Sequence, residues 1–310
     1  MIPTFPARLS QKERLLKAVT MRRDIVTMTH AAGSGHPGGS LSAVELLVAL
    51  FFEHLKHNPA DPQWKERDFM IFCKCHITPT IYSILARSGY FSPEILLTFR
   101  KFGSPLQGHP YRFYPAGIEM SGGSLGQNLS IAGGVALGLK TQGKPNRVYA
   151  LSSEGDLQEG QSWEAIMSAA HFRLDNLCLL VDYNKLQIDG YVEDVMGVHP
   201  LDEKFRSFNW HVLSVENGHD FNEINAAISS AKTLTGRPQV IIAHTVKGKG
   251  ISFMENQAGW HGKAPNADEC QKALIELAQQ EELILQNDLV PASPISYTFK
   301  IKEKIPPYKV

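Results

Sequence analysis

Two short apolar runs, each followed closely by a polar side chain, constrain the fold of this chain most. Residues 148–151 and 177–181 are almost wholly apolar, which is typical of strands buried on both faces of a parallel sheet. Glu154 follows the first run and Asn184 follows the second. Because the carboxyl ends of parallel strands meet at one edge of a sheet, we expect this carboxylate and amide to lie together.

Further apolar runs alternate with helical patterns along the rest of the chain. Strands are predicted at 69–72, 148–151, 177–181, 210–215 and 239–244. Helices are predicted at 11–30, 43–55, 76–88, 93–102, 128–140, 159–172, 223–233 and 268–286, with Ser40 or Ser42 capping the second. This alternation predicts an α/β fold, a parallel sheet with helices on both faces. We expect one domain over residues 1–287 and a proline-spaced tail over 288–310.

The composition excludes several classes of protein. The 310 residues are 43% hydrophobic and 20% charged, which is typical of a globular chain. Its 31 basic and 31 acidic residues cancel, which argues against a nucleic-acid partner. No apolar run reaches the roughly 18–20 residues of a membrane span, and the N-terminus lacks the apolar core of a signal peptide. Four cysteines in this length favour a reduced, cytoplasmic setting.

Glu154 and Asn184 are candidate ligands for a hard cation. Mg²⁺ prefers about six oxygens in near-octahedral geometry, and the backbone carbonyl of Leu186 could add a third oxygen from the protein. A glycine-rich segment, residues 121–127, opens a predicted helix whose first N–H groups could face an anion. Gly155, next to Glu154, could do the same. Taken singly, each feature is also compatible with an ordinary turn or strand end.

Four histidines lie in loops or at helix starts, with small residues close by. They are His36, His76, His109 and His261. Such positions suit hydrogen bonding to a polyhydroxy or phosphorylated ligand, or proton transfer near neutral pH, although an exposed loop histidine is the simpler alternative. Other histidines lack this setting and are interpreted as surface or packing residues. These include His54, His57, His171 and His219.

Seven motifs together resemble transketolase, from about residue 10 to 280 and in the same order. They are GSGHPGG (33–39), LQGHP (106–110), GGSLGQ (122–127), LQEGQSWEA (157–165), VDYNKLQIDG (181–190), VKGKG (246–250) and WHGKAP (260–265). Full transketolases are about twice this length, so the chain resembles the N-terminal, diphosphate-binding subunit of a split transketolase. The resemblance implies that thiamine diphosphate lies between this domain and a pyrimidine-binding partner subunit, without which the chain is inactive.

The resemblance also implies an activity and a set of residue roles. The activity is transfer of a two-carbon ketol unit between a sugar donor and an aldose or aldose phosphate, in a heterotetramer of two plus two subunits. The metal ligands are Glu154, Asn184 and the Leu186 carbonyl. The catalytic residues are His36, His76, His109 and His261. The cofactor contacts are His76, Gly123, Ser124, Leu125, Gly155, Asp156, Asn184 and His261. Glu159 and Glu164 match acidic residues at the subunit interface.

The chain departs from the family pattern at the expected metal site, called here the metal corner, which consists of Glu154, Asn184 and the Leu186 carbonyl. The family usually has Gly-Asp-Gly-Glu where residues 153–156 read Ser-Glu-Gly-Asp. An ungapped alignment places Glu154 at the ligand position, whereas using Asp156 would require gaps. Glutamate is one methylene longer, which Mg²⁺ tolerates poorly and Ca²⁺ accepts. Bulkier residues also replace small ones at Cys75 and Asn128. Either the site serves a different keto donor or acceptor in a specialised pathway, or the chain is a non-catalytic binding or regulatory subunit.

Overall fold

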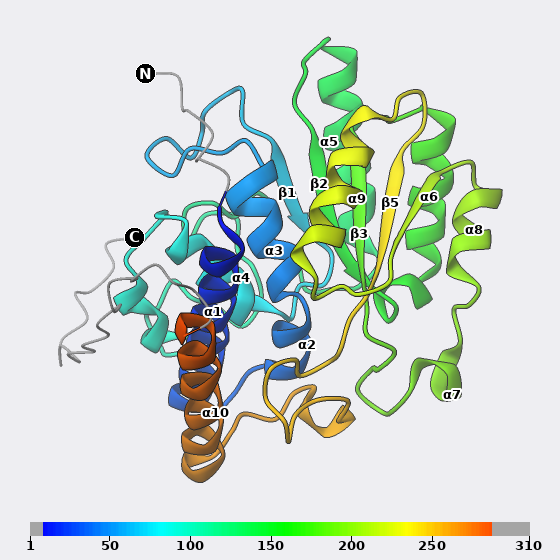
Figure 1. Ribbon diagram of the computed structural model, residues 1–310. Helices are drawn as coiled ribbons and strands as arrows, with labels where there is room; N and C mark the ends of the chain where they lie inside the picture. Colours follow the sequence, from blue (N-terminus) through cyan, green and yellow to red (C-terminus); the bar gives the residue numbers. More distant parts are fainter. Residues whose placement is uncertain (1–8, 287–310) are drawn as a thin grey trace.

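A five-stranded parallel sheet forms the centre of the computed structural model, which describes residues 9–286. In spatial order the strands are β1 (Phe69–Phe72), β2 (Val148–Ser153), β3 (Leu177–Tyr183), β5 (Gln239–His244) and β4 (His211–Val215). Every neighbouring pair runs parallel. The predicted strands and the parallel sheet are therefore confirmed (Figure 1).

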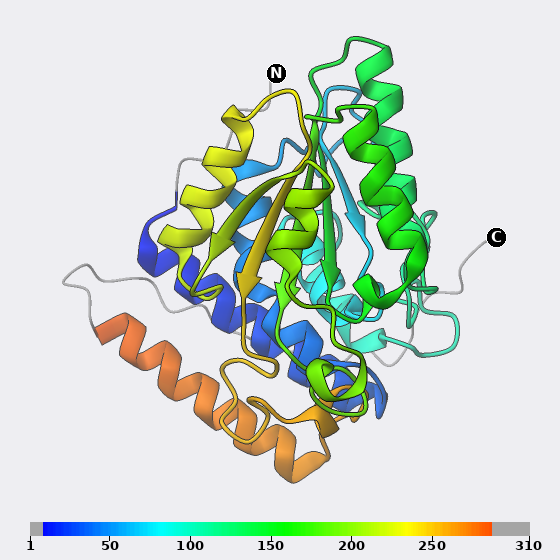
Figure 2. The same ribbon diagram turned by 90° about the vertical axis from the view of Figure 1, so that its right-hand side faces the viewer.

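Helices cover both faces of the sheet, and the strands alternate between two cores. On β2, Tyr149 and Leu151 face one core while Val148 and Ala150 face the other. The first core is built with α1 (Gln11–Ala32), α3 (Val44–Ala49), α4 (Thr78–Arg87) and α9 (Phe221–Thr233). The second is built with α5 (Gln127–Thr141), α6 (Gly160–His171) and α8 (Leu201–Ser207). The last described helix, α10 (Ala267–Gln286), lies along α1 (Figure 2).

The helical region after α1 differs from the prediction. Helix α2 (Pro37–Ser42) already begins inside the glycine-rich loop, because Pro37 is preorganised for the first helical position. Ser40 and Ser42 therefore lie inside a helix, and the prediction that one of them caps the next helix is wrong. The helix predicted at 43–55 is divided into α3 and a π-helical turn, Leu50–His54.

Most of the remaining elements follow the predictions, and the differences are confined to short helices, which include the 3-10 helices Asp156–Gln158 and Ala258–Trp260. Residues 93–102 contain only a 3-10 helix, Pro93–Thr98, and the segment after β3 contains α8 and the short α7 (Val192–Met196), neither of which was predicted. Within residues 9–286 no helix is both long and apolar enough to cross a membrane. The four cysteines are free and buried, and a cytoplasmic setting stays a prediction. The predicted tail, 288–310, lies outside the described residues.

Candidate functional site

Glu154 and Asn184 meet at the carboxyl ends of two paired strands. Strands β2 and β3 are neighbours, and the backbone N–H of Lys185 donates to Oε2 of Glu154 over 2.6 Å. Glu154 is only 2% exposed, and its Oε1 is buried without a hydrogen-bond partner. Burial raises the pKa of Glu154 to about 7. His199 Nε2 lies 3.8 Å from this oxygen, beyond hydrogen-bond distance. A buried carboxylate oxygen without a hydrogen bond is costly, so this oxygen is suited to receive a cation.

The side chain of Asp156 is directed elsewhere. Its Oδ1 accepts from the backbone N–H of Gly126 over 2.8 Å, and its Oδ2 accepts from the Ser152 hydroxyl over 2.5 Å. Both carboxylate oxygens are therefore occupied, Oδ1 by the glycine turn before α5 and Oδ2 by the end of β2. This favours Glu154 over Asp156 as the carboxylate of the metal corner.

Asn184 and Leu186 add two further oxygens beside Glu154. The amide oxygen of Asn184 accepts from the Leu186 N–H over 3.2 Å, and the Leu186 carbonyl accepts from Lys247 Nζ over 3.2 Å. No group of three or more His, Cys, Asp or Glu side chains within the described part of the chain is arranged to hold a metal. The corner is instead a mixed set of carboxylate, amide and carbonyl oxygens, which suits a hard cation.

The four histidines singled out from the sequence converge on one cluster. The ring of His36 lies 5.2 Å from that of His76, 6.5 Å from that of His109 and 5.5 Å from that of His261, measured between centroids. The rings of His76 and His261 are 4.9 Å apart. Residues separated by more than 200 positions in the sequence are thus brought to the same edge of the sheet.

Burial favours the neutral form of these imidazoles. It lowers the pKa of His36 to about 4 and that of His261 to about 3, and nearby cations such as Arg100 and Lys247 act in the same direction. Burial also lowers the pKa of His76 and of His109. A neutral imidazole can accept a proton at one nitrogen while donating a hydrogen bond from the other.

Two buried lysines complete the site, and sequence reasoning assigned no role to either. Lys74 Nζ lies 2.5 Å from Oδ2 of Asp182, and both side chains are buried. Lys247 Nζ lies 2.9 Å from Nδ1 of His261, and burial lowers the pKa of Lys247 to about 7. Lys247 lies in the VKGKG motif. Its position among small and apolar residues is the sequence signal that could have identified it as a site residue.

The glycine segments approach this cluster closely. A Cβ on Gly39 would lie 3.1 Å from Lys74 Nζ and 3.4 Å from His76 Nε2, and one on Gly123 would lie 3.6 Å from the His109 ring. Ser40 Oγ and His76 Nε2 are buried and have no hydrogen-bond partner. These glycines carry no side chain over the backbone, and polar atoms without hydrogen-bond partners lie beside it. This arrangement is consistent with a phosphorylated ligand held here.

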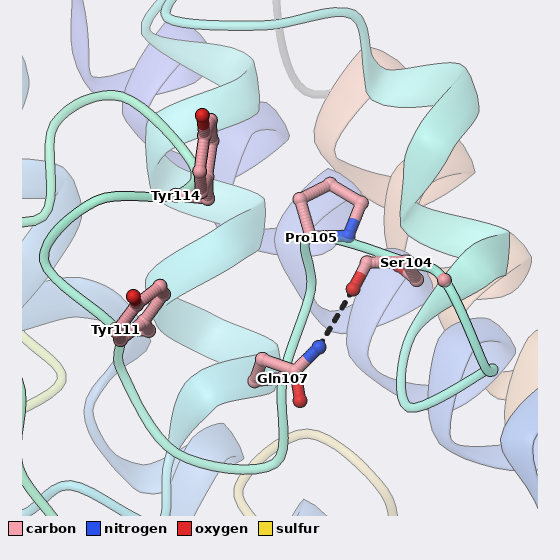
Figure 3. A pocket seen from close by; sticks show the side chains of 6 residues that line it. Ser104, Pro105, Gln107, Tyr111 and Tyr114 are labelled. Carbon is pink, nitrogen blue, oxygen red and sulfur yellow. Dashed lines mark hydrogen bonds between the residues drawn. The ribbon is translucent and has the colours of Figure 1, made fainter. Parts of the chain in front are cut away.

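One cavity borders the site, and a second lies on a neighbouring loop. The first, of about 290 Å³, is lined by Glu154 together with Tyr183, Tyr191 and His199. The other, of about 460 Å³, lies along the loop that carries His109, but it is lined by none of the four histidines. Figure 3 shows Tyr111 and Tyr114 on one side of it, and the Gln107 side chain donating to the Ser104 carbonyl over 2.7 Å.

A family model described as the thiamine diphosphate binding domain of transketolase matches residues 13–292. The chain belongs to the transketolase family. A 6-deoxy-6-sulfo-D-fructose transketolase subunit from Clostridium sp. is 42% identical, over 80% of this chain and 90% of that protein. An apulose-4-phosphate transketolase subunit from Actinobacillus succinogenes is 38% identical, over 89% of this chain and 99% of that protein.

The fold agrees with solved transketolases. The crystal structure of transketolase from Campylobacter jejuni matches with a TM-score of 0.83 and 33% identity, over 89% of this chain and 46% of that one. The present chain is therefore the N-terminal, thiamine-diphosphate-binding subunit of a transketolase-like transferase, as its sequence motifs predicted. The roles of its individual site residues remain predictions.

Proposed function

We propose that this subunit, with a C-terminal-type partner, transfers a two-carbon ketol unit from a ketose to an aldose or aldose phosphate. The main support for the proposal is a cluster of four histidines at the same sheet edge as the metal corner. They are His36, His76, His109 and His261. Bound thiamine diphosphate supplies carbanion chemistry for breaking and forming a carbon–carbon bond. The residues of this chain bind the diphosphate, exclude water and move protons.

The metal corner is proposed to hold Mg²⁺ against the diphosphate. Glu154, Asn184 and the Leu186 carbonyl provide the oxygens, and the buried Oε1 of Glu154, which accepts no hydrogen bond, supports this assignment. Ca²⁺ is the alternative, since it accepts the longer reach of a glutamate. The proposed cofactor contacts are His76, Gly123, Ser124, Leu125, Gly155, Asp156, Asn184 and His261. Of these, Asp156 acts by holding the Gly126 N–H and so shaping the turn.

The histidines are proposed to handle the hydroxyl protons of the sugar. The pKa of His36 and that of His261 lie well below neutrality, so both rings are neutral near pH 7 and can serve as hydrogen-bond partners for sugar hydroxyls. His109 is the most exposed of the four histidines, and we assign it to the donor sugar. His76 is the more deeply buried ring, and we assign it to the cofactor side.

Assembly into a heterotetramer of two plus two subunits is part of the proposal. Glu159 directly precedes α6, and Glu164 lies in the second turn of that helix. Both side chains are exposed, and we expect the subunit interface here. The same helix exposes 57% of Met167, and Phe172 beyond its end is 46% exposed. An apolar and acidic surface of this kind suits pairing with another subunit. Met167→Glu should therefore lower the assembled mass in sedimentation without unfolding the chain.

A specialised substrate is the second candidate. Two of the relatives that are themselves transketolase subunits are named for 6-deoxy-6-sulfo-D-fructose and for apulose-4-phosphate. The departures at Glu154, Cys75 and Asn128 lie near the proposed cofactor face: Asn128 Nδ2 lies 3.4 Å from Cys75 Sγ and donates to the Phe72 carbonyl. They are consistent with a different keto donor or acceptor.

Calorimetry of thiamine diphosphate and Mg²⁺ against the chain co-purified with its partner tests these proposals. Binding followed by ketol transfer to an aldose phosphate supports the enzyme and excludes the regulatory subunit. Binding with transfer only from a different keto donor selects the specialised enzyme. If saturating metal produces no binding of the cofactor, both enzyme proposals fail.

A further inference from the structure

We propose that His219 is a positioning residue, which holds the backbone beside Lys247 and thereby sets where the Lys247 ammonium lies. The proposal rests on the proposed function, because Lys247 contacts the metal corner and the histidine cluster. His219 lies in the loop between β4 and α9, and its side chain is only 9% exposed. The sequence pattern had suggested a surface or packing residue.

The ring of His219 connects two elements that are far apart in the sequence. Its Nε2 accepts from the backbone N–H of Val246 over 2.8 Å, and its Nδ1 lies 2.9 Å from Oε2 of Glu45 on α3. Because a backbone N–H can only donate, Nε2 must be the unprotonated nitrogen. Nδ1 therefore carries the proton and donates to Glu45, so the two contacts define one neutral tautomer.

Glu45 is in turn held by Arg22 on α1. Arg22 Nη2 donates to Oε1 of Glu45 over 2.5 Å, and both side chains are 5% exposed. Burial alone would raise the pKa of Glu45, but the Arg22 guanidinium and His219 lower it to about 2, so the carboxylate stays ionised. Arg22 Nε also donates to the Lys249 carbonyl over 2.9 Å. The network is therefore hydrogen-bonded to the 245–250 loop at two positions, Val246 and Lys249.

The loop that this network holds leads directly into the site. Val246 precedes Lys247, whose Nζ donates to the Leu186 carbonyl over 3.2 Å and lies 2.9 Å from His261 Nδ1. The β4–α9 loop is also pressed against the chain just before Val246, since a Cβ on Gly218 would lie 2.6 Å from Thr245 Cγ2. A shift at Val246 therefore moves the ammonium relative to both of its partners.

Two measurements on His219→Leu test this role. Hydrogen–deuterium exchange of the full chain reports the backbone at residues 245–250, and calorimetry with thiamine diphosphate and Mg²⁺ on the chain co-purified with its partner reports cofactor affinity. We expect exchange at 245–250 and the cofactor Kd each to rise on the order of tenfold, because the Val246 N–H loses its acceptor and Glu45 loses its donor from the β4–α9 loop. His219→Gln keeps an acceptor and a donor and should recover most of both.

His54→Leu is the matched control. His54 is also 9% exposed, and its Nε2 lies 2.8 Å from Oδ1 of Asn225 on α9, away from the 245–250 loop. We expect His54→Leu and His219→Leu each to lower Tm, because each removes a buried hydrogen bond. His54→Leu should leave exchange at 245–250 and the cofactor Kd unchanged. A double-mutant cycle with Lys247→Met separates positioning from packing, since His219→Leu should add little to Kd once Lys247 is gone.

The outcomes separate this inference from the proposed function. Unchanged exchange at 245–250 in His219→Leu, or raised exchange with an unchanged Kd, overturns the positioning role. Additive effects of His219→Leu and Lys247→Met on Kd overturn it as well. If the wild-type protein binds no cofactor, the proposed function fails, while the exchange measurement still decides whether His219 holds the loop. If His219→Leu does not fold, exchange of the wild-type chain still tests the role, because fast exchange of the Val246 amide would overturn it.

Discussion

The ammonium nitrogen of Lys74 lies 2.5 Å from Oδ2 of Asp182, and the two side chains are 2% and 0% exposed. The pair joins the end of β1 to β3 across the intervening β2. The Ser42 hydroxyl donates to the same Oδ2 over 2.6 Å, and the Thr245 hydroxyl donates to Oδ1. Asp182 is therefore a fully bonded anchor two residues before Asn184, and it fixes the strand end from which the metal corner projects.

Removal of Lys74 should destabilise the fold strongly. Lys74→Met leaves the Asp182 carboxylate buried without its countercharge, which typically costs about 3–5 kcal/mol in the free energy of unfolding. Urea denaturation measures this loss. Lys74→Met/Asp182→Asn removes the uncompensated charge and should recover part of the loss, and equal stability of the single variant and wild type would contradict the pairing.

Glu154→Asp should change which metal the site prefers. The shorter carboxylate should favour compact octahedral Mg²⁺ over Ca²⁺, because a glutamate must bend its extra methylene to reach a small ion. Titration of each metal into the assembled protein with saturating thiamine diphosphate measures the ratio of the two affinities. An unchanged ratio would count against Glu154 as a ligand.

Two glycines next to the site should respond differently to alanine. A Cβ on Gly122 would lie 2.3 Å from Cys75 Sγ and 2.4 Å from Asn128 Nδ2, so Gly122→Ala should lower the free energy of unfolding by about 1–3 kcal/mol. A Cβ on Gly155 would meet nothing within 4 Å. Gly155→Ala should therefore leave thermal stability near that of wild type and weaken cofactor binding. A stable Gly122→Ala protein would show that the turn can relax.

Acid should destabilise the protein through its buried histidines. The ordinary histidine pKa is near 6.5, whereas that of folded His36 is about 4 and that of folded His261 about 3. As pH falls below 6.5 the unfolded chain binds protons that the folded chain does not, so the free energy of unfolding decreases until the folded pKa values are reached. His36→Asn/His261→Asn should therefore lose stability less steeply between pH 6.5 and 4.5 in denaturation curves. A slope equal to that of wild type would be inconsistent with buried neutral rings.

The strands were predicted well because each is a short, continuous apolar run. Parallel strands buried on both faces need such runs, and the alternation with helical patterns predicts the layers. The errors occur where local signals compete. Pro37 starts a helix inside a glycine-rich segment, which displaced the expected cap at Ser40 or Ser42. Helices α7 and α8 are too short to show a clear period.

The sequence by itself determined the parallel α/β fold, the family and the placement of Glu154, Asn184 and the four histidines at loop and strand ends. These depend on local patterns and motif order, which are visible along one chain. Only the tertiary structure decided that Asp156 holds the glycine turn, that Lys74 pairs with Asp182, and that His219 holds the loop before Lys247. Each is a contact between segments distant in sequence, and its partners are selected by packing and by the cost of burying an unpaired polar group.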